Sequence, residues 1–244
     1  MRMRRAAAVA LVAASTITAC GNGDDKSQST LPQGSESVEL DPVDFTTRID
    51  NPYWPMRPGS RWVYRETDSE GAVQRVEVTV TSKTKKIANG IEARVVRDEV
   101  TEQGRPVEIT DDWYAQDSEG NVWYLGERTT EYENGRPKTT AGSFEAGVDG
   151  AQPGIVVPAK PESGMTYRQE FYAGEAEDKA EVVSLDEQVE VPFGHFKDVL
   201  MTRDLNSLKP KILEFKFYAR GVGPVLAVSV SGGSDREELV RYTE

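Results

Sequence analysis

Alternation of apolar and polar residues with a period of two, interrupted by glycine turns, is the feature that most constrains how this chain folds. Val76, Val78 and Val80 share one side of a predicted strand, and the polar residues between them share the other. Turn sequences such as Asn89-Gly90 recur, and their glycines lie 19, 14, 16 and 15 residues apart: Gly71, Gly90, Gly104, Gly120 and Gly135. These spacings leave room for strands of roughly ten residues joined by short loops, which predicts an antiparallel meander.

The alternation resumes in the C-terminal half of the chain. It covers residues 166–172, 180–185, 188–193, 198–205, 212–219, 225–230 and 238–243. The glycine- and proline-rich interval 141–164 is expected to cross an edge or the mouth of the sheet. We therefore predict an all-β domain of about eleven to thirteen strands with few or no long helices. To limit exposed edges, such a long meander curls into a barrel, half-barrel or sandwich.

The first twenty residues have the composition of a bacterial export signal. Arg2, Arg4 and Arg5 form a basic start, and residues 6–14 form an apolar stretch too short to span a bilayer. The run Ile17–Cys20, followed by glycine, resembles the lipobox of bacterial lipoproteins, which implies cleavage before the cysteine and acylation of its thiol. The alternative is an ordinary secretory peptide cleaved elsewhere, with an incidental free thiol.

The export signal predicts the location and the domain organisation of the protein. An acylated Cys20 would anchor it in the cell membrane, on the extracytoplasmic side, with the membrane as its partner. Because Cys20 is the sole cysteine, its acylation also removes disulfides and thiol catalysis from the folded domain. The expected division is a lipoprotein signal peptide over residues 1–19, a lipidated N-terminus and disordered tether over 20–44, and a single all-β domain over 45–244.

The charge and residue counts exclude several classes of function. The chain has 41 acidic and 29 basic residues, a formal net charge of −12, which becomes −15 without the three signal arginines. Such a field repels nucleic acid, so we expect no nucleic-acid partner. One histidine, His195, and one cysteine are too few for the usual zinc sites. We expect no metal and no cofactor, and we interpret His195 as a loop residue.

Four segments have sequence patterns that recur in a known family: 50–64 (DNPYWPMRPGSRWVY), 113–127, 189–203 (VEVPFGHFKDVLMTR) and 217–228 (FYARGVGPVLAV). The first resembles the opening of exported bacterial lipoproteins of unknown function, among them TapB-like proteins. The last two resemble their ending, "vPaGtF … yYapGvG", and residues 113–127 also fit. The resemblance implies a curved antiparallel sheet on the cell envelope and supplies no catalytic residues.

The glycines and prolines of these segments have local roles that favour architecture over chemistry. Gly59 is expected in a turn that leads Trp62 into the sheet, and Gly194 is expected to adopt a positive φ after Pro192 has ended a strand. Gly221 and Gly223 are expected to mark a tight bend or a bulge.

Aromatic residues are the best candidates for a binding surface. We select Trp62, Tyr64, Trp113 and Trp123 as candidate ligand-binding residues, because a curved sheet could present them in a concave pocket to an apolar ligand or envelope component. The alternative is that they fill the core of the barrel. In that case the protein would be an interaction or scaffold lipoprotein that acts through an exposed sheet face or edge.

A carboxylate-based, carbohydrate-active enzyme is the third alternative. Asp111, Asp112 and Asp117 flank an aromatic pair, as a sugar site requires. Alternation favours another interpretation, in which Val107, Ile109 and Trp113 form the buried face and the acids take solvated positions or turns. We therefore expect a non-enzymatic protein without catalytic residues. Convergent acids in a cleft, with perturbed titration, would favour the enzyme.

Overall fold

Strands account for almost all regular structure in this protein. The computed structural model describes residues 31–244; residues 1–30, with the predicted signal peptide and Cys20, lie outside the described part. A compact unit spans Leu31–Glu244. Within it the helical structure is one 3₁₀ turn, η1 (Pro42–Asp44), and no helix of residues 31–244 has the length and apolarity needed to cross a membrane. The all-β prediction is confirmed.

Fifteen strands are present in the described residues. Their bounds are β1 Phe45–Thr46, β2 Arg61–Thr67, β3 Val73–Lys86, β4 Glu92–Glu102, β5 Arg105–Asp117, β6 Val122–Glu133, β7 Arg136–Thr139, β8 Phe144–Glu145, β9 Gln152–Val157, β10 Thr166–Tyr172, β11 Ala176–Val191, β12 Gly194–Asn206, β13 Leu213–Ala219, β14 Gly223–Ser231 and β15 Arg236–Thr243.

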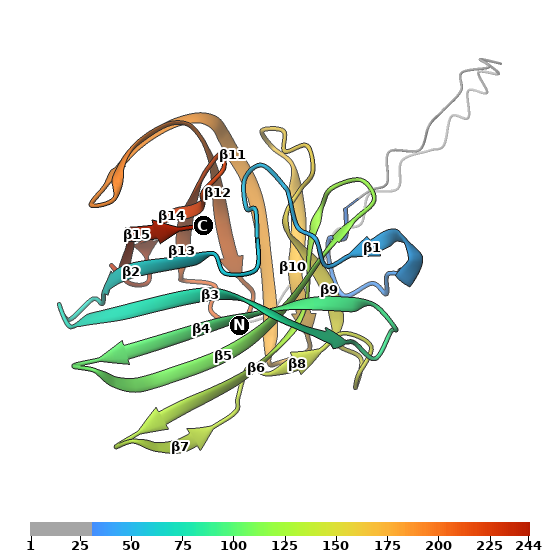
Figure 1. The fold of residues 1–244 in the computed structure, drawn as a ribbon, viewed down its shortest axis with the longest axis horizontal. Coiled ribbons are helices and arrows are strands. Elements are labelled where there is room, and N and C mark those ends of the chain that lie inside the picture. The colour runs from blue at the N-terminus through green and yellow to red at the C-terminus, as the bar shows by residue number, and fades with distance from the viewer. Residues whose placement is uncertain (1–30) are drawn as a thin grey trace, which may run out of the picture. The chain divides into compact units, whose positions relative to one another are not determined.

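Twelve of these strands form a closed antiparallel barrel (Figure 1). Strands β2 to β6 pair in chain order, and so do β9 to β15. The ring closes because β15 pairs with β2 and β9 pairs with β6. Three short strands lie off the ring: β1 pairs with β5, and β7 and β8 pair with β6. The predicted meander is thus a full barrel.

The glycine- and proline-rich interval 141–164 contains a barrel strand, contrary to its predicted course across an edge or mouth. Its residues form β8 and β9, and β9 joins the two runs of the meander by pairing with β6 and β10. A glycine is required in β9, because a β-carbon on Gly154 would collide with the backbone of Gln169. This close approach of two strands explains why a glycine stands inside a strand.

The folded unit begins before the predicted boundary near residue 45. Leu31, Val38 and Leu40 pack against the core. The backbone N–H of Arg168 in β10 donates to the carbonyl of Pro32 at 2.6 Å, and its guanidinium donates to the carbonyl of Glu36 at 2.8 Å. Residues 31–44 therefore belong to the folded unit, because β10 supplies hydrogen-bond partners for their backbone.

A loop between β1 and β2 closes one end of the barrel. Ile49, Tyr53 and Met56 in this loop are almost inaccessible to solvent. The side chain of Asn51 donates to the carbonyl of Gly120, in the turn after β5, and the carbonyl of Pro52 accepts from the N–H of Gly221, in the turn after β13. Since β5 and β13 are not neighbours in the sheet, the loop spans this end of the barrel.

The predicted glycine turns are present at three of the four positions named above. Gly59, Gly221 and Gly223 have φ values of +100°, +75° and +107°, which L-residues rarely adopt. Gly194 is different, since it begins β12 without a positive φ. His195 follows it within β12 and is exposed, so it is a strand residue and not a loop residue.

Candidate functional site

Acidic side chains at alternate positions of β5 and β6 point into the barrel. Glu108, Thr110 and Asp112 share one side of β5, opposite Glu131, Thr129 and Glu127 of β6. The hydroxyl oxygens of Thr110 and Thr129 lie 2.7 Å apart, within a buried pair. This side of the strand pair is therefore the polar interior of the barrel.

The predicted burial of β5 is wrong for Asp112. Val107 and Ile109 are only half-buried, whereas Asp112 is buried. Asp111 points outward and pairs with Arg97 and Arg128, each at 2.8 Å. Asp117 accepts hydrogen bonds from the turn after β5, including the N–H of Gly120 at 2.9 Å. Of the three acids considered for sugar chemistry, one faces the interior.

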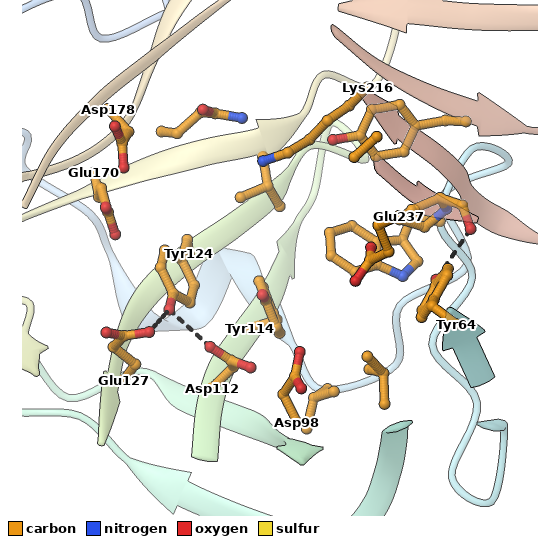
Figure 2. A pocket seen from close by; sticks show the side chains of 18 of the residues that line it. Tyr64, Asp98, Asp112, Tyr114, Tyr124, Glu127, Glu170, Asp178, Lys216 and Glu237 are labelled. Carbon is orange, nitrogen blue, oxygen red and sulfur yellow. Dashed lines mark hydrogen bonds between the residues drawn. The ribbon is translucent and has the colours of Figure 1, made fainter. Parts of the chain in front are cut away.

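A cavity of about 330 Å³ lies inside the barrel (Figure 2). Its volume falls in the usual range of small-molecule sites. Aromatic side chains form much of its wall: Trp54, Tyr64, Tyr114, Tyr124 and Tyr218. Six carboxyl groups and one amine complete the ionisable lining: Asp98, Asp112, Glu127, Glu170, Asp178, Glu237 and Lys216. The cavity is therefore both aromatic and acidic.

Trp54 forms the floor of this cavity. It comes from the loop that closes the barrel, and its ring centroid lies 5.5 Å from that of Tyr114 in β5 and 6.2 Å from that of Tyr218 in β13. These strands lie far apart in the sheet order, so the indole reaches across the interior. Tyr114 also stacks on Tyr124 at 5.0 Å, which continues the aromatic wall onto β6.

Two carboxyl groups share the hydroxyl of Tyr124. Its oxygen lies 2.7 Å from a carboxyl oxygen of Asp112 and 2.7 Å from one of Glu127. A tyrosine hydroxyl donates one hydrogen, so the second short contact requires a proton on a carboxyl group. Accordingly, burial raises the pKa of Asp112 well above its usual range, and burial also raises the pKa of Glu127. This group of three side chains holds one more proton than its isolated members would at neutral pH.

Other cavity acids are displaced in the same direction. Burial, followed by the nearby carboxylate of Glu237, raises the pKa of Asp98 well above its usual range. Burial and the carboxylate of Glu66 raise the pKa of Glu237 to about 8. Repulsion among acids in a partly desolvated space favours their neutral forms.

Lys216 is the basic group of the described lining. Burial lowers its pKa, but Asp204 and Glu214 raise it, and the outcome is a pKa well above the usual lysine value. Its amine lies 3.0 Å from Asp204 and 3.4 Å from Glu214, and 37 % of the side chain remains accessible beside the cavity. The ammonium group is thus charged and already paired.

Of the four aromatic residues selected from the sequence, Tyr64 lines the cavity. Its hydroxyl donates to the carbonyl of Pro224 at 3.0 Å. Trp62 is buried against Tyr242, with ring centroids 5.2 Å apart, and is not part of the lining.

The other two selected tryptophans lie elsewhere in the fold. Trp113 lies under the amine of Lys85, 4.3 Å from the ring centroid, and lines an open depression separate from the cavity. Trp123 donates its indole N–H to Asp117 at 2.7 Å. Each of these tryptophans precedes a tyrosine that faces the cavity, Tyr114 or Tyr124, so each lies on the other side of its strand.

Four lining residues were not among the site residues selected from the sequence: Trp54, Asp98, Lys216 and Glu237. Period-two spacing could have placed Asp98 and Glu237 on inward-facing positions. Asp98, for example, shares a side of β4 with Val96 and Val100. Among residues 31–244, no group of three or more histidine, cysteine, aspartate or glutamate residues is arranged to hold a metal ion.

Comparisons with known proteins give distant structural likenesses. No protein-family model and no curated protein matches the chain. A "putative lipoprotein" from Parabacteroides distasonis resembles it with a TM-score of 0.42 and 11 % identity, over 78 % of this chain and 98 % of that one. A β-barrel-like protein of a domain of unknown function from Brucella abortus resembles it with a TM-score of 0.36 and 13 % identity, over 77 % and 98 %. At these TM-scores neither likeness bears on what the cavity binds.

Proposed function

We propose that this protein is a non-enzymatic lipoprotein of the cell envelope that binds a small molecule inside its barrel. The observation that carries the proposal is the cavity of about 330 Å³, walled by aromatic side chains and convergent polar groups. A barrel filled with apolar side chains would favour the scaffold alternative instead. The apolar ligand expected from the sequence fits poorly, because it would remove six lining carboxyl groups from water and supply no hydrogen bond to the unpartnered Oδ1 of Asp98.

An interaction through a free sheet edge has less support. Ring closure leaves no long edge among the barrel strands, and the strands outside the ring are short: two residues in β1, four in β7 and two in β8. Edge-to-edge pairing with a partner requires a longer row of free backbone groups. We therefore rank ligand binding above the scaffold function.

The location of the protein is part of this proposal. The lipobox-like run ending at Cys20 supports a lipid anchor on the extracytoplasmic side of the cell membrane, from which the barrel would project. We expect Cys20→Ser to move the protein from the membrane fraction to the soluble fraction. Unchanged fractionation would contradict the anchor.

A carboxylate-based glycosidase is the second candidate. Asp112 and Glu127 are close enough to share one hydroxyl, and retaining glycosidases hold two carboxyl groups about 5–5.5 Å apart. However, the hydroxyl of Tyr124 occupies the space between them, where the anomeric carbon of a sugar would have to lie. We expect no hydrolysis of aryl glycosides, and turnover that Asp112→Asn abolishes would establish the enzyme.

The binding function can be tested without knowing the ligand. The full-length protein is purified from its own envelope, and native mass spectra are compared before and after extraction with organic solvent. We expect a small-molecule adduct that extraction removes and that Tyr114→Trp, which fills part of the cavity, reduces. If the spectra show no adduct even before extraction, the proposed ligand-binding function is contradicted.

A further inference from the structure

Charge is sorted between the two faces of the barrel. The arginines that form ion pairs on the strands, such as Arg65, Arg97 and Arg128, have exposed side chains, and no arginine of residues 31–244 lines the cavity. The interior contains six lining carboxyl groups and the ammonium of Lys216. Asp204 and Glu214, which are not part of the lining, already pair with that ammonium. The ionisable groups left for a ligand to meet are therefore carboxyl groups.

One of the lining acids has an oxygen without a partner. Oδ1 of Asp98 is buried and accepts no hydrogen bond from the described residues. Asp98 lines the cavity, near Asp112 and Glu237 (Figure 2). A buried polar atom without a partner is costly, and proteins satisfy such atoms with few exceptions. A ligand that donates hydrogen bonds would satisfy this oxygen.

The walls add a second requirement. Trp54 and Tyr114, with the other tyrosines of the lining, offer ring faces as well as apolar area. Aromatic faces attract cations and pack against apolar or aromatic groups. An anion would meet repulsion from the carboxylates, and a small metal ion would find no preformed set of three ligands among residues 31–244.

We propose that the cavity binds an organic ammonium ion, with the charged nitrogen among Asp98, Asp112 and Glu237 and an apolar or aromatic body against Trp54. This inference rests on the proposed ligand-binding function and specifies the class of ligand. A primary ammonium group carries three donors, which suits both the free oxygen of Asp98 and its acidic neighbours.

Binding of the cation exchanges with protons. Carboxyl groups on four other strands interact electrostatically with Asp98: Glu66 in β2, Glu108 and Asp112 in β5, Glu127 in β6 and Glu237 in β15. Because burial and these neighbours raise the pKa of Asp98, the empty site holds protons that an ammonium ion displaces. Proton release is a readout that non-specific adsorption of the ligand to the surface does not produce.

Three probes of matched size test the class of ligand. The full-length protein, in a non-ionic detergent, is titrated with phenethylammonium, 2-phenylethanol and phenylacetate near pH 8, and binding is followed by calorimetry and by tryptophan fluorescence. Calorimetry in phosphate and in Tris measures proton release, because the two buffers differ in ionisation enthalpy. We expect phenethylammonium to bind about tenfold more tightly than 2-phenylethanol, with release of protons, and phenylacetate not to bind.

Variants locate the binding. Asp98→Asn should weaken phenethylammonium binding about tenfold and leave 2-phenylethanol unaffected. Glu99→Gln is the matched control: Glu99 is the next residue of β4, its side chain is 43 % accessible on the outer face, and the variant should leave binding unchanged. The fluorescence response should disappear in Trp54→Phe, and thermal melting shows that each variant is folded.

The outcomes separate the two proposals. Equal binding of the neutral and cationic probes, or tighter binding of phenylacetate, would overturn the ammonium inference while the ligand-binding function stands. Competition by calcium at equal concentration would assign the acids to a metal ion and overturn the inference as well. If no probe binds and native mass spectra show no adduct, both proposals fail.

Discussion

Gly223 lies so close to Trp54 that it cannot carry a side chain. A β-carbon at Gly223 would lie 2.7 Å from Cδ1 of the indole, and the φ of +107° is itself rarely adopted by L-residues. The glycine at the start of β14 thus positions the floor of the cavity. The close packing of the β1–β2 loop on the start of β14, and not the strand pattern, therefore fixes where the indole lies in the cavity.

Gly223→Ala is therefore expected to lower the free energy of unfolding by about 2–4 kcal/mol, from backbone strain and overpacking together. It should also shift the emission of Trp54. Gly221→Ala is the matched control, because Gly221 has a φ of +75° but open space around its β-carbon, so it should cost about 1–2 kcal/mol and leave the emission unchanged. Equal losses in urea unfolding would show that the indole does not depend on Gly223.

Strand periodicity was sufficient to predict a curled, all-β antiparallel meander, for which a barrel, a half-barrel and a sandwich remained alternatives. The predicted strand 166–172 coincides with β10, whereas the predicted strand 180–185 and most of the predicted strand 188–193 belong to one strand, β11, which ends at Val191. Register shifts between Val182 and Ser184, and again before Glu187 and Val189, explain the difference. A bulge adds a residue to one strand and interrupts the alternation without ending the strand.

Periodicity could not show which face lies inside. Residues two apart share a side of a strand, but the pattern does not say which side encloses the cavity. In β5 the apolar residues Val107 and Ile109 suggested that their side of the strand faces inward. The side that lines the cavity is the opposite one, which carries Asp112. Apolar residues are usually assigned to the inner face of a sheet, and this assignment fails where a barrel encloses a polar cavity. Trp54 had no periodic signal at all, since it lies in a loop held by long-range hydrogen bonds.

The acids of the cavity should make the protein less stable as the pH rises. Burial, Glu66 and Glu214 keep the pKa of Glu237 at about 8, with Lys216 opposing them, whereas a glutamate in the unfolded chain has an ordinary pKa of 4.5. Between these values the folded state binds more protons, so the free energy of unfolding falls through this window and levels off above it. The melting temperature should be lower at about pH 8 than at about pH 5.

Glu237→Gln should flatten this dependence, because the amide cannot ionise. The matched control is Glu99→Gln, whose outward-facing carboxyl lies near Arg97 at 3.7 Å. This control should retain the slope of the wild-type protein between about pH 5 and 8. A melting temperature that rises with pH in the wild-type protein would contradict the clustering of acids in the interior.

Arg168 should fasten the N-terminal segment to the barrel. Its side chain is 1 % exposed and donates to the carbonyls of Pro153, Gly34 and Glu36. Arg168→Met leaves these acceptors without their donor, and we expect a loss of about 2–4 kcal/mol and faster proteolysis within residues 31–40. Lys179→Met, on the exposed part of β11, is the control and should change neither. Unchanged proteolysis in Arg168→Met would show that the packing of Leu31 and Leu40 alone holds the segment.

Asp111 and Asp112 should respond to the same substitution with opposite signs. Asp112→Asn removes a buried carboxyl that is costly to ionise, and its amide can donate to Tyr124 while Tyr124 donates to Glu127. We expect it to raise the free energy of unfolding by about 1–2 kcal/mol near pH 8. The gain should shrink as the pH falls below about 3.9, because aspartate then becomes protonated in the unfolded state as well.

Asp111→Asn instead breaks the outward ion pairs with Arg97 and Arg128, which, against the opposing effect of burial, lower the pKa of Asp111. A carboxyl group whose pKa is lowered by folding stabilises the folded state at pH values above its pKa in the unfolded chain. The free energy of unfolding of this variant should therefore be about 1 kcal/mol lower than that of the wild-type protein near pH 8, and the difference should vanish in acid. Urea unfolding of both variants at two pH values measures the contrast. If both variants are less stable than the wild-type protein near pH 8, Asp112 is ionised and paired in the folded state. The acids on the inner side of β5 would then not form a site that holds protons and exchanges them for a cation.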